Sequence, residues 1–389
     1  MMTNRWLLPE NIADVLPGKS DLVELLRREI LDLFKSYGYE LVMPPMLEYI
    51  ESLLTATGSD MDLQTFKLVD QLSGRTLGLR ADITTQVARI DAHILNRLNI
   101  ARLCYSGTTV QTRVVPGIFS REQLQAGAEI YGHHGIEADI EIVQLMMKSL
   151  HLAKLGPITL DVSHAGLLKD ILDKKHLNAD DISEVYRFLQ AKDRAGLERL
   201  MSSWDAVAKG TILSLLKLSG DARDVLDRAK KVLPPSIVCD QVLQDLEHFC
   251  SGVQSSSIDM KLNIDLADLD GFQYHTGILC AAYVNDYPVA IARGGRYDQV
   301  GQAFGRSRPA TGFSVDLLAL ASLSSRTVLT KAIMAPCDPS TSLKEAVAIL
   351  RSQGEVVIES FSGHEHNEST MVCDRQLVLQ DQKWQVVPK

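Results

Sequence analysis

Disulfide, zinc and membrane signatures are all missing from this sequence. Its six cysteines are scattered over 389 residues without a Cys-x-x-Cys pair or a cysteine–histidine cluster, which argues against a disulfide framework and a structural zinc site. No apolar run approaches the roughly 18 residues that a membrane span needs. The N-terminal stretch contains Pro9, Asn11, Asp14 and Pro17, so it fits neither a secretory signal nor a transit peptide. We therefore expect a cytoplasmic protein that has no membrane partner.

The common catalytic motifs are missing too. The sequence has no Walker-type phosphate loop, GxSxG elbow, HExxH helix or Rossmann glycine motif, which excludes the commonest nucleotide, hydrolase and metalloprotease sites. His364 and His366 lie close together, but two histidines in a polar loop are far more often solvated than bound to a metal. We expect neither a metal nor a cofactor.

Positive charge is in deficit. The chain has 40 Lys and Arg against 49 Asp and Glu, a formal net charge of −9. Phosphate contacts need clustered Lys and Arg, so nonspecific binding of nucleic acid has no global electrostatic support. A local basic groove stays open as an alternative.

What the sequence does contain is a succession of segments typical of an α+β protein. Apolar residues at three- and four-residue spacing predict a helix from Ser20 to a stop at Gly38. Residues 66–80 predict a hairpin around Ser73-Gly74, and residues 101–132 predict two strands joined by a loop. Because strands come in runs with helices grouped between them, we predict an antiparallel sheet flanked by helices.

The chain is expected to divide into a large domain and a short tail. Residues 1–325 carry the sheet, and polar, helix-favouring sequence from about 165 to 251 predicts a helical insertion within it. Strand segments then resume, and a helix is expected to begin near Val315 to Leu323. Residues 326–389 predict a short α/β tail that contains the order strand, helix, strand.

One predicted strand carries polar side chains in a pattern typical of a pocket floor. Gln125, Gly127 and Glu129 occur at alternate positions of REQLQAGAEIYG, so an extended strand points all three to one face. An amide and a carboxylate that converge on a cavity can hold a ligand ammonium or imidazole group. The spacing is equally compatible with the solvent face of an edge strand.

Three further segments carry weaker patterns. GFQYHTG places Tyr274 and His275 beside a strand, and RGGRYD places two glycines between Arg293 and Arg296. Such glycines permit close approach of a ligand or a neighbouring strand. LRADITT places Asp82 and Thr84 at a strand-to-helix junction, where capping of the helix is the favoured interpretation.

Taken together and in order, these segments resemble histidyl-tRNA synthetases, which have the class II synthetase fold. GYELVMPPMLE is similar to motif 1, with Pro45 at its characteristic proline, and LRADITT is similar to the segment LRPEGT. REQLQAGAEIYG is similar to the strand RQFHQFGVEVFG. FQYHTG, ARGGRYD and ATGFSVDL are similar to the histidine-specific loop, the glycine-rich strand and motif 3. The histidine-binding positions that the resemblance implies are Asp82, Thr84, Gln125, Glu129, Tyr274 and His275.

The departures from the synthetase pattern lie where ATP would bind. By the resemblance, Gln111 replaces the motif 2 arginine that binds the α-phosphate, and Arg113 replaces a glutamate that meets the adenine. Asp270 replaces a catalytic arginine, and SVDLLAL lacks the arginine of motif 3. Neither a neutral amide nor an anion balances the charge that develops on phosphate. The resemblance therefore implies an ATP site that no longer forms an adenylate.

The tail departs as well. The 63 residues after Arg326 are fewer than the anticodon-binding domain of the synthetases needs, and their last segment has no basic surface. We therefore expect no binding of tRNA.

A retained histidine pocket, an altered ATP site and a short tail are together similar to the regulatory subunits of ATP phosphoribosyltransferase. That resemblance implies a non-catalytic subunit that pairs with the short catalytic subunit in the first step of histidine biosynthesis and transmits feedback inhibition by L-histidine. It also implies a homodimer, built around motif 1, within a hetero-oligomer. The alternatives are an active histidyl-tRNA synthetase or another amino-acid-activating class II paralogue, and both need an ATP site.

Overall fold

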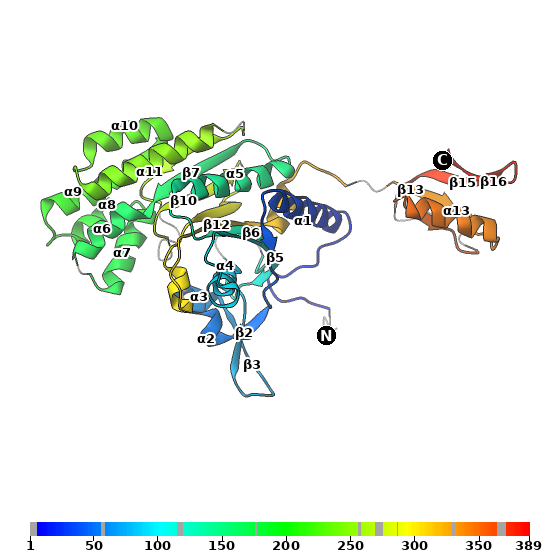
Figure 1. Ribbon diagram of the computed structural model, residues 1–389, viewed down its shortest axis with the longest axis horizontal. Helices are drawn as coiled ribbons and strands as arrows, with labels where there is room; N and C mark the ends of the chain where they lie inside the picture. Colours follow the sequence, from blue (N-terminus) through cyan, green and yellow to red (C-terminus); the bar gives the residue numbers. More distant parts are fainter. Residues whose placement is uncertain are drawn as a thin grey trace, which may run out of the picture. The chain divides into compact units, whose positions relative to one another are not determined.

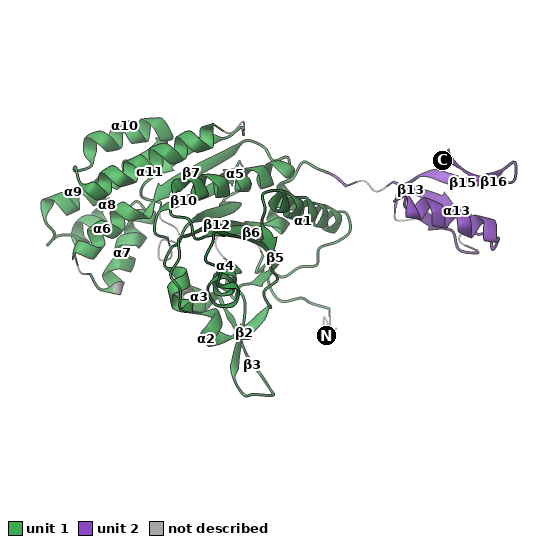
Figure 2. Ribbon diagram, viewed as in Figure 1, with its two compact units in different colours: residues 1–326 green, residues 327–389 purple. Residues whose placement is uncertain are grey.

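A computed structural model describes residues 6–55, 59–114, 120–175, 177–255, 258–268, 275–285, 287–328, 331–363 and 371–389. The chain divides into two compact units, residues 1–326 and residues 327–389 (Figure 2). None of the described helices is both long and apolar enough to cross a bilayer.

The first unit is built on one large sheet (Figure 1). Its neighbouring strands pair antiparallel except for β1 with β5 and β7 with β9, which are parallel. The predicted antiparallel sheet is therefore confirmed. In spatial order its strands are β1 (Glu40–Leu41), β5 (Ala101–Val110), β6 (Glu122–Tyr131), β12 (Ala310–Asp316), β11 (Ala292–Arg296), β10 (Ile278–Val284), β7 (Ile158–His164), β9 (Lys261–Asp265) and β8 (Ser219–Asp221).

Three helices cover one face of this sheet: α1 (Lys19–Ser36), α5 (Ile136–Leu152) and α12 (Leu317–Leu323). The predicted helix α1 buries its apolar stripe, and Phe34 at its end meets Phe313 of β12 edge-on, with ring centroids 5.7 Å apart. Gly38, at φ +82°, follows the helix as expected. Helix α12 begins at Leu317 rather than at Val315, because β12 continues to Asp316, whose carboxylate then accepts a hydrogen bond from Leu318 N.

Shorter elements cover the opposite face. Helix α4 (Thr84–Arg89) continues as a π-helical turn, η1 (Ile90–Leu95), and packs with the 3-10 turn η2 (Val300–Phe304) against the sheet. A separate small sheet has the strand order β2 (Leu47–Tyr49), β4 (Thr76–Leu79) and β3 (Phe66–Val69). Helix α2 (Ile50–Leu53) contacts β2 and β4, and helix α3 (Ser59–Gln64) precedes β3. Strands β3 and β4 form the predicted hairpin, and Gly74 takes φ +70° in its turn.

Residues 165–254 are mostly helical. Several helices start with an Asp, Asn or Ser side chain that accepts a hydrogen bond from the first turn, as N-caps do. The sequence did not predict β8, whose residues Ser219, Gly220 and Asp221 lack β-propensity and form a strand only by pairing with β9. The helices are α6 (Ala165–Lys175), α7 (Ala179–Gln190), α8 (Arg194–Leu200), α9 (Ala206–Leu215), α10 (Ala222–Val232) and α11 (Ile237–Gln254).

The second unit contains the expected strand, helix and strand: β13 (Ala332–Ala335), α13 (Thr341–Ser352) and β14 (Val357–Glu359). It also contains a hairpin that the sequence did not predict, β15 (Cys373–Gln380) with β16 (Lys383–Pro388). Its turn places Asp381 and Gln382 at φ +47° and +62°. Two-residue hairpin turns of this kind usually carry Asn-Gly or Asp-Gly, so Asp381-Gln382 did not indicate a turn.

Candidate functional site

A cavity of about 180 Å³ lies on the face of the large sheet that α4 covers. Its size suits a ligand smaller than the drug-sized molecules that occupy pockets of about 300 Å³ or more. Strands β6, β11 and β12 supply its floor, and the start of α4 supplies part of its wall. The described residues that line it are Met61, Asp82, Thr84, Thr85, Glu129, His275, Arg293, Gly294, Gly295, Tyr297, Val300, Gly312, Phe313 and Ser314.

Glu129 is the central ionisable group of the cavity. Its side chain is 1% exposed, and its carboxyl group accepts hydrogen bonds from the hydroxyls of Tyr105, at 3.2 Å, and Tyr297. Burial raises the pKa of Glu129 to about 8, and the negative charge of Asp82 acts in the same direction. The carboxyl group is therefore mainly protonated at neutral pH until a ligand brings a positive charge or a hydrogen-bond donor.

Glycines make room for this carboxyl group. A Cβ atom at Gly312 of β12 would overlap Glu129 Oε2, and one at Gly127 of β6 would overlap the Tyr105 hydroxyl. The space that the sequence predicted beside Gly127 is thus filled by the tyrosine that donates to Glu129. Because β6 lies between β5 and β12, it is not an edge strand, and the solvent-face alternative for Gln125 and Glu129 is wrong.

Asp82, Thr84 and Gln125 form a connected polar group at the start of α4. Gln125 Nε2 donates to Asp82 Oδ1 at 2.7 Å, and Gln125 Oε1 accepts from Ile83 N at 3.1 Å. Thr84 N donates to Asp82 Oδ2 at 3.1 Å, but the N-cap residue of α4 is Ile83, which makes no side-chain cap hydrogen bond, so Asp82 does not cap the helix in the expected way. Asp82 and Thr84 line the cavity, whereas Gln125 is not among its described lining residues and orients Asp82 through their hydrogen bond.

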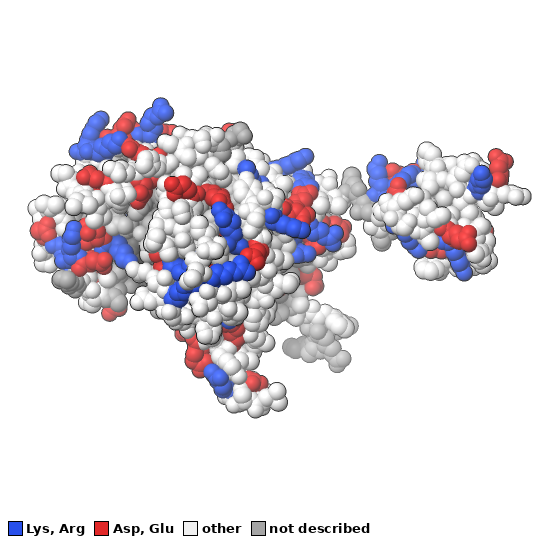
Figure 3. Space-filling model, in the orientation of Figure 1, with Lys and Arg blue, Asp and Glu red and all other residues white. Residues whose placement is uncertain are grey.

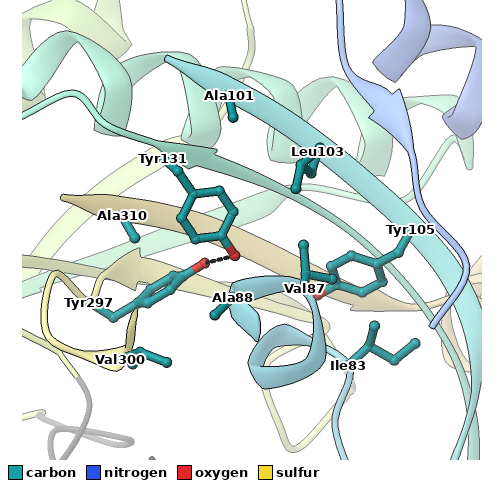
Figure 4. Close-up of a cluster of buried hydrophobic side chains, with 10 residues drawn as sticks. All are labelled: Ile83, Val87, Ala88, Ala101, Leu103, Tyr105, Tyr131, Tyr297, Val300 and Ala310. Carbon is teal, nitrogen blue, oxygen red and sulfur yellow. Dashed lines mark hydrogen bonds between the residues drawn. The ribbon is translucent and has the colours of Figure 1, made fainter. Parts of the chain in front are cut away.

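Two tyrosines of the site were not among the predicted residues. Tyr105 of β5 and Tyr297, which follows β11, come from distant segments and both donate to Glu129. Figure 4 shows them with Tyr131, whose hydroxyl lies 3.3 Å from that of Tyr297. The sequence offered two indications: Tyr105 alternates with Leu103 on one strand face, and Tyr297 directly follows the RGGR segment.

Of the other residues predicted for the histidine and ATP sites, one lines the cavity, two are not among its described lining residues, and two lie outside the described part of the chain. His275 lines the cavity, and Tyr274 and Asp270 lie outside the described residues. Gln111 and Arg113 follow β5 and are not among the described lining residues; the backbone of Gln111 pairs with Arg121.

Of the two arginines that flank the glycine pair, only Arg293 lines the cavity. Arg296 is buried and forms an ion pair with Asp139 of α5 at 2.6 Å. Arg293 is thus the one Lys or Arg among the described lining residues.

Comparison with known proteins identifies the family of the chain. Residues 11–320 match the family profile described as histidyl-tRNA synthetase, and residues 330–387 match the profile described as the ATP phosphoribosyltransferase subunit HisZ C-terminal domain. An ATP phosphoribosyltransferase regulatory subunit of Polynucleobacter asymbioticus is 54% identical over 386 residues, 99% of this chain and 100% of the relative. A protein of Cupriavidus necator with the same name is 51% identical over 100% of both chains.

The chain belongs to the ATP phosphoribosyltransferase regulatory subunit family. Within this family's fold, a Bacillus halodurans structure described as a regulatory subunit/histidyl-tRNA synthetase has a TM-score of 0.79 and 26% identity, over 92% of this chain and 94% of that one. Histidyl-tRNA synthetase from Nostoc has a TM-score of 0.75 at 19% identity, over 96% of this chain and 91% of that one, which shows a shared fold. The predicted class II synthetase-like fold is confirmed.

The pH dependence of stability tests the buried carboxyl group of Glu129. Its pKa is raised from 4.5 to about 8 on folding, so the stability that it contributes is fully present below pH 4.5 and is lost as the pH rises through about 8. Relative to Glu129→Gln, the wild type should lose up to about 1.4 kcal/mol of unfolding free energy per pH unit in this window. Urea unfolding of both proteins across the window measures this difference, and a difference that does not vary with pH would contradict the assignment.

Proposed function

We propose that this chain is a non-catalytic, cytoplasmic subunit of ATP phosphoribosyltransferase that binds L-histidine in the cavity at Glu129. In this role it activates the short catalytic subunit in the first step of histidine biosynthesis and transmits feedback inhibition by histidine. The observation that carries the proposal is the buried carboxyl group of Glu129, which is bonded to two tyrosine hydroxyls and faces a cavity of amino-acid size. The family to which the chain belongs supports the choice of enzyme.

The polar groups of the cavity match the two ends of histidine. Asp82 and Thr84 offer a carboxylate and a hydroxyl to an α-ammonium group, while Glu129 accepts a hydrogen bond from a ring N–H, with His275 on the same cavity wall. A charge-assisted hydrogen bond to a buried carboxylate such as that of Glu129 is stronger than one to an exposed carboxylate. The ligand would therefore favour ionisation of Glu129 and gain affinity from it.

Histidine activation has little support in this site. Class II adenylate formation needs cations on the phosphates of ATP, and Gln111 is neutral at the position where the resemblance expects one. Arg293 is the one described Lys or Arg on the cavity wall, and a single cation does not replace a set of them.

The isolated chain should therefore catalyse no histidine-dependent ATP–pyrophosphate exchange. The measurement uses the full chain with ATP, magnesium and L-histidine, beside an active histidyl-tRNA synthetase as the positive control. Robust exchange would favour the synthetase alternative and overturn the proposal.

Binding of tRNA is not expected either. The formal net charge is −9, and on the face in Figure 3 the Lys and Arg side chains are interspersed with Asp and Glu. A filter-binding titration with histidine tRNA at physiological salt should show no specific complex. A complex that resists salt and is selective for that tRNA would contradict this expectation.

Truncation of Glu129 should weaken histidine binding. Glu129→Ala removes the acceptor for the ligand N–H, which costs about 1 to 3 kcal/mol, or roughly five- to a hundredfold in affinity. Calorimetry of the wild type and the variant with L-histidine measures the change. Glu137→Ala is the control, because Glu137 is exposed and lies outside the cavity lining. Normal binding by Glu129→Ala would show that the pocket assignment is wrong.

We also propose a homodimer built around the segment between β1 and β2. Strand β1 lies at the end of the large sheet, and Leu41, Met43 and Leu47 are 52%, 79% and 45% exposed. Three large apolar side chains exposed within seven residues are typical of an interaction site, and two copies of one surface meet through a two-fold axis. The catalytic subunit would then join a symmetric hetero-oligomer.

Sedimentation of the isolated chain tests the dimer. The wild type should sediment as a dimer at micromolar concentration, and Met43→Asp should shift it towards monomer because a charge would be buried at the interface. Leu379→Asp is the control, because Leu379 is 54% exposed in the second unit. A monomeric wild type would contradict the proposed association.

A further inference from the structure

A second cavity, of about 160 Å³, lies beside the first. The two cavities share His275, Arg293 and Gly294 in their walls. The second extends over β7 and β10, where Asp161, Ser163, Leu279 and Ala281 contribute to its lining. It has no role in the function proposed above.

The strand register places both cavities on one face of the sheet. Ser163 of β7 pairs with Leu279, which pairs with Gly295, then Gly312 and then Glu129. Residues directly paired across a sheet point to the same face. Ser163 therefore faces the same side as Glu129, four strands away.

Ser163 is a buried polar residue without a visible partner. Its side chain is 4% exposed, and none of the described residues provides a hydrogen-bond partner for its Oγ atom. Buried hydroxyl groups almost always form a hydrogen bond, so a buried hydroxyl group without one needs an explanation. Because Ser163 lines the cavity, a bound ligand would supply the missing hydrogen bond.

Acidic residues outnumber basic ones in the lining of the second cavity, where Arg293 is the one Lys or Arg among the described residues. Asp161, Asp265 and Asp268 line the cavity. Asp161 Oδ1 accepts from Asn263 Nδ2 at 3.1 Å, and Asp265 is paired with Lys192 at 2.8 Å. Burial raises the pKa of Asp161, and the charge of Asp265 adds to this effect. A cation beside Asp161 would remove the penalty on its ionised form.

The chemistry of the wall favours an organic cation over a metal ion. Across the described residues, no group of three or more His, Cys, Asp or Glu side chains is placed to hold a metal. An ammonium group carries three donors and no acceptor, and both Asp161 and Ser163 Oγ can accept from it. The apolar side chains of Leu279 and Ala281 offer contacts to the carbon chain that carries the ammonium group.

We infer that the second cavity binds a small organic ligand through an ammonium group that donates to Asp161 and Ser163, while the first cavity holds its own ligand. The inference goes beyond the proposed function and does not depend on whether histidine fills the first cavity. It makes this face of the sheet a surface with two separate subsites, divided by His275 and Arg293.

Methyl NMR of the full chain tests the inference with ethanolamine as the probe. Ethanolamine should shift the methyl signals of Leu279 and Ala281, both with and without saturating L-histidine. Choline carries the same charge but no N–H donor and should leave these signals unchanged. Histidine binding to the first cavity is followed separately at Val300, so its failure would be seen there and would not alter the result at Leu279.

Two variants link the shifts to the polar wall. Ser163→Ala should weaken ethanolamine binding about tenfold without lowering the melting temperature, because the hydroxyl has no partner among the described residues. Asp161→Asn keeps an acceptor for Asn263 but removes the charge, and should weaken binding at least as much. The inference is overturned if ethanolamine causes no shift, if choline shifts the same signals, if histidine displaces ethanolamine, or if both variants bind it normally.

Discussion

The carboxyl group of Glu129 is buried in the interior of the protein, and this burial disfavours its charged form. Its hydrogen bonds come from the hydroxyls of Tyr105 and Tyr297, which stabilise it less than a cation would. Two glycines on adjacent strands leave the space that the carboxyl group and Tyr105 occupy. A ligand with a positive charge or an N–H donor stabilises the ionised carboxylate more than the two tyrosine hydroxyls alone do, so ligand binding and ionisation of Glu129 are linked.

Helix α4 connects this cavity to the proposed dimer surface. It opens at Thr84 in the cavity wall, and two residues later Gln86 donates to Pro45 O at 2.8 Å and to Glu48 at 2.9 Å. Arg89 at its end forms an ion pair with Glu48. A ligand that favours one position of α4 would thereby favour one arrangement of the segment around Pro45. The coupling can be no larger than the difference in ligand affinity between the two arrangements.

The sequence could predict those parts of the site that depend on local periodicity. Gln125, Gly127 and Glu129 share a strand face because side chains alternate, and α1 follows the helical spacing of its apolar residues. The convergence of Tyr105 and Tyr297 on Glu129 could not be predicted in this way, because it depends on strand pairing between distant segments. Strand β8 was missed for the same reason, because pairing with the distant β9 forms it without the usual strand residues. The β15–β16 hairpin was missed because its turn, Asp381-Gln382, lacks the usual turn residues.

Gln125 lies on the predicted strand face but is not among the described residues that line the cavity. The strand pattern put its amide on the pocket face, but both ends of that amide are engaged by Asp82 and by Ile83 N. It therefore holds Asp82 in position at the cavity.

The most direct measurement of the central claim is histidine inhibition of the complex reconstituted from this chain and the short catalytic subunit. The comparison is between wild type and Glu129→Gln, which keeps the size of the side chain but removes its charge. We predict that both complexes are active and that the variant needs at least about tenfold more histidine for half inhibition. Unchanged inhibition of the variant complex would place the histidine sensor on the catalytic subunit and contradict the account.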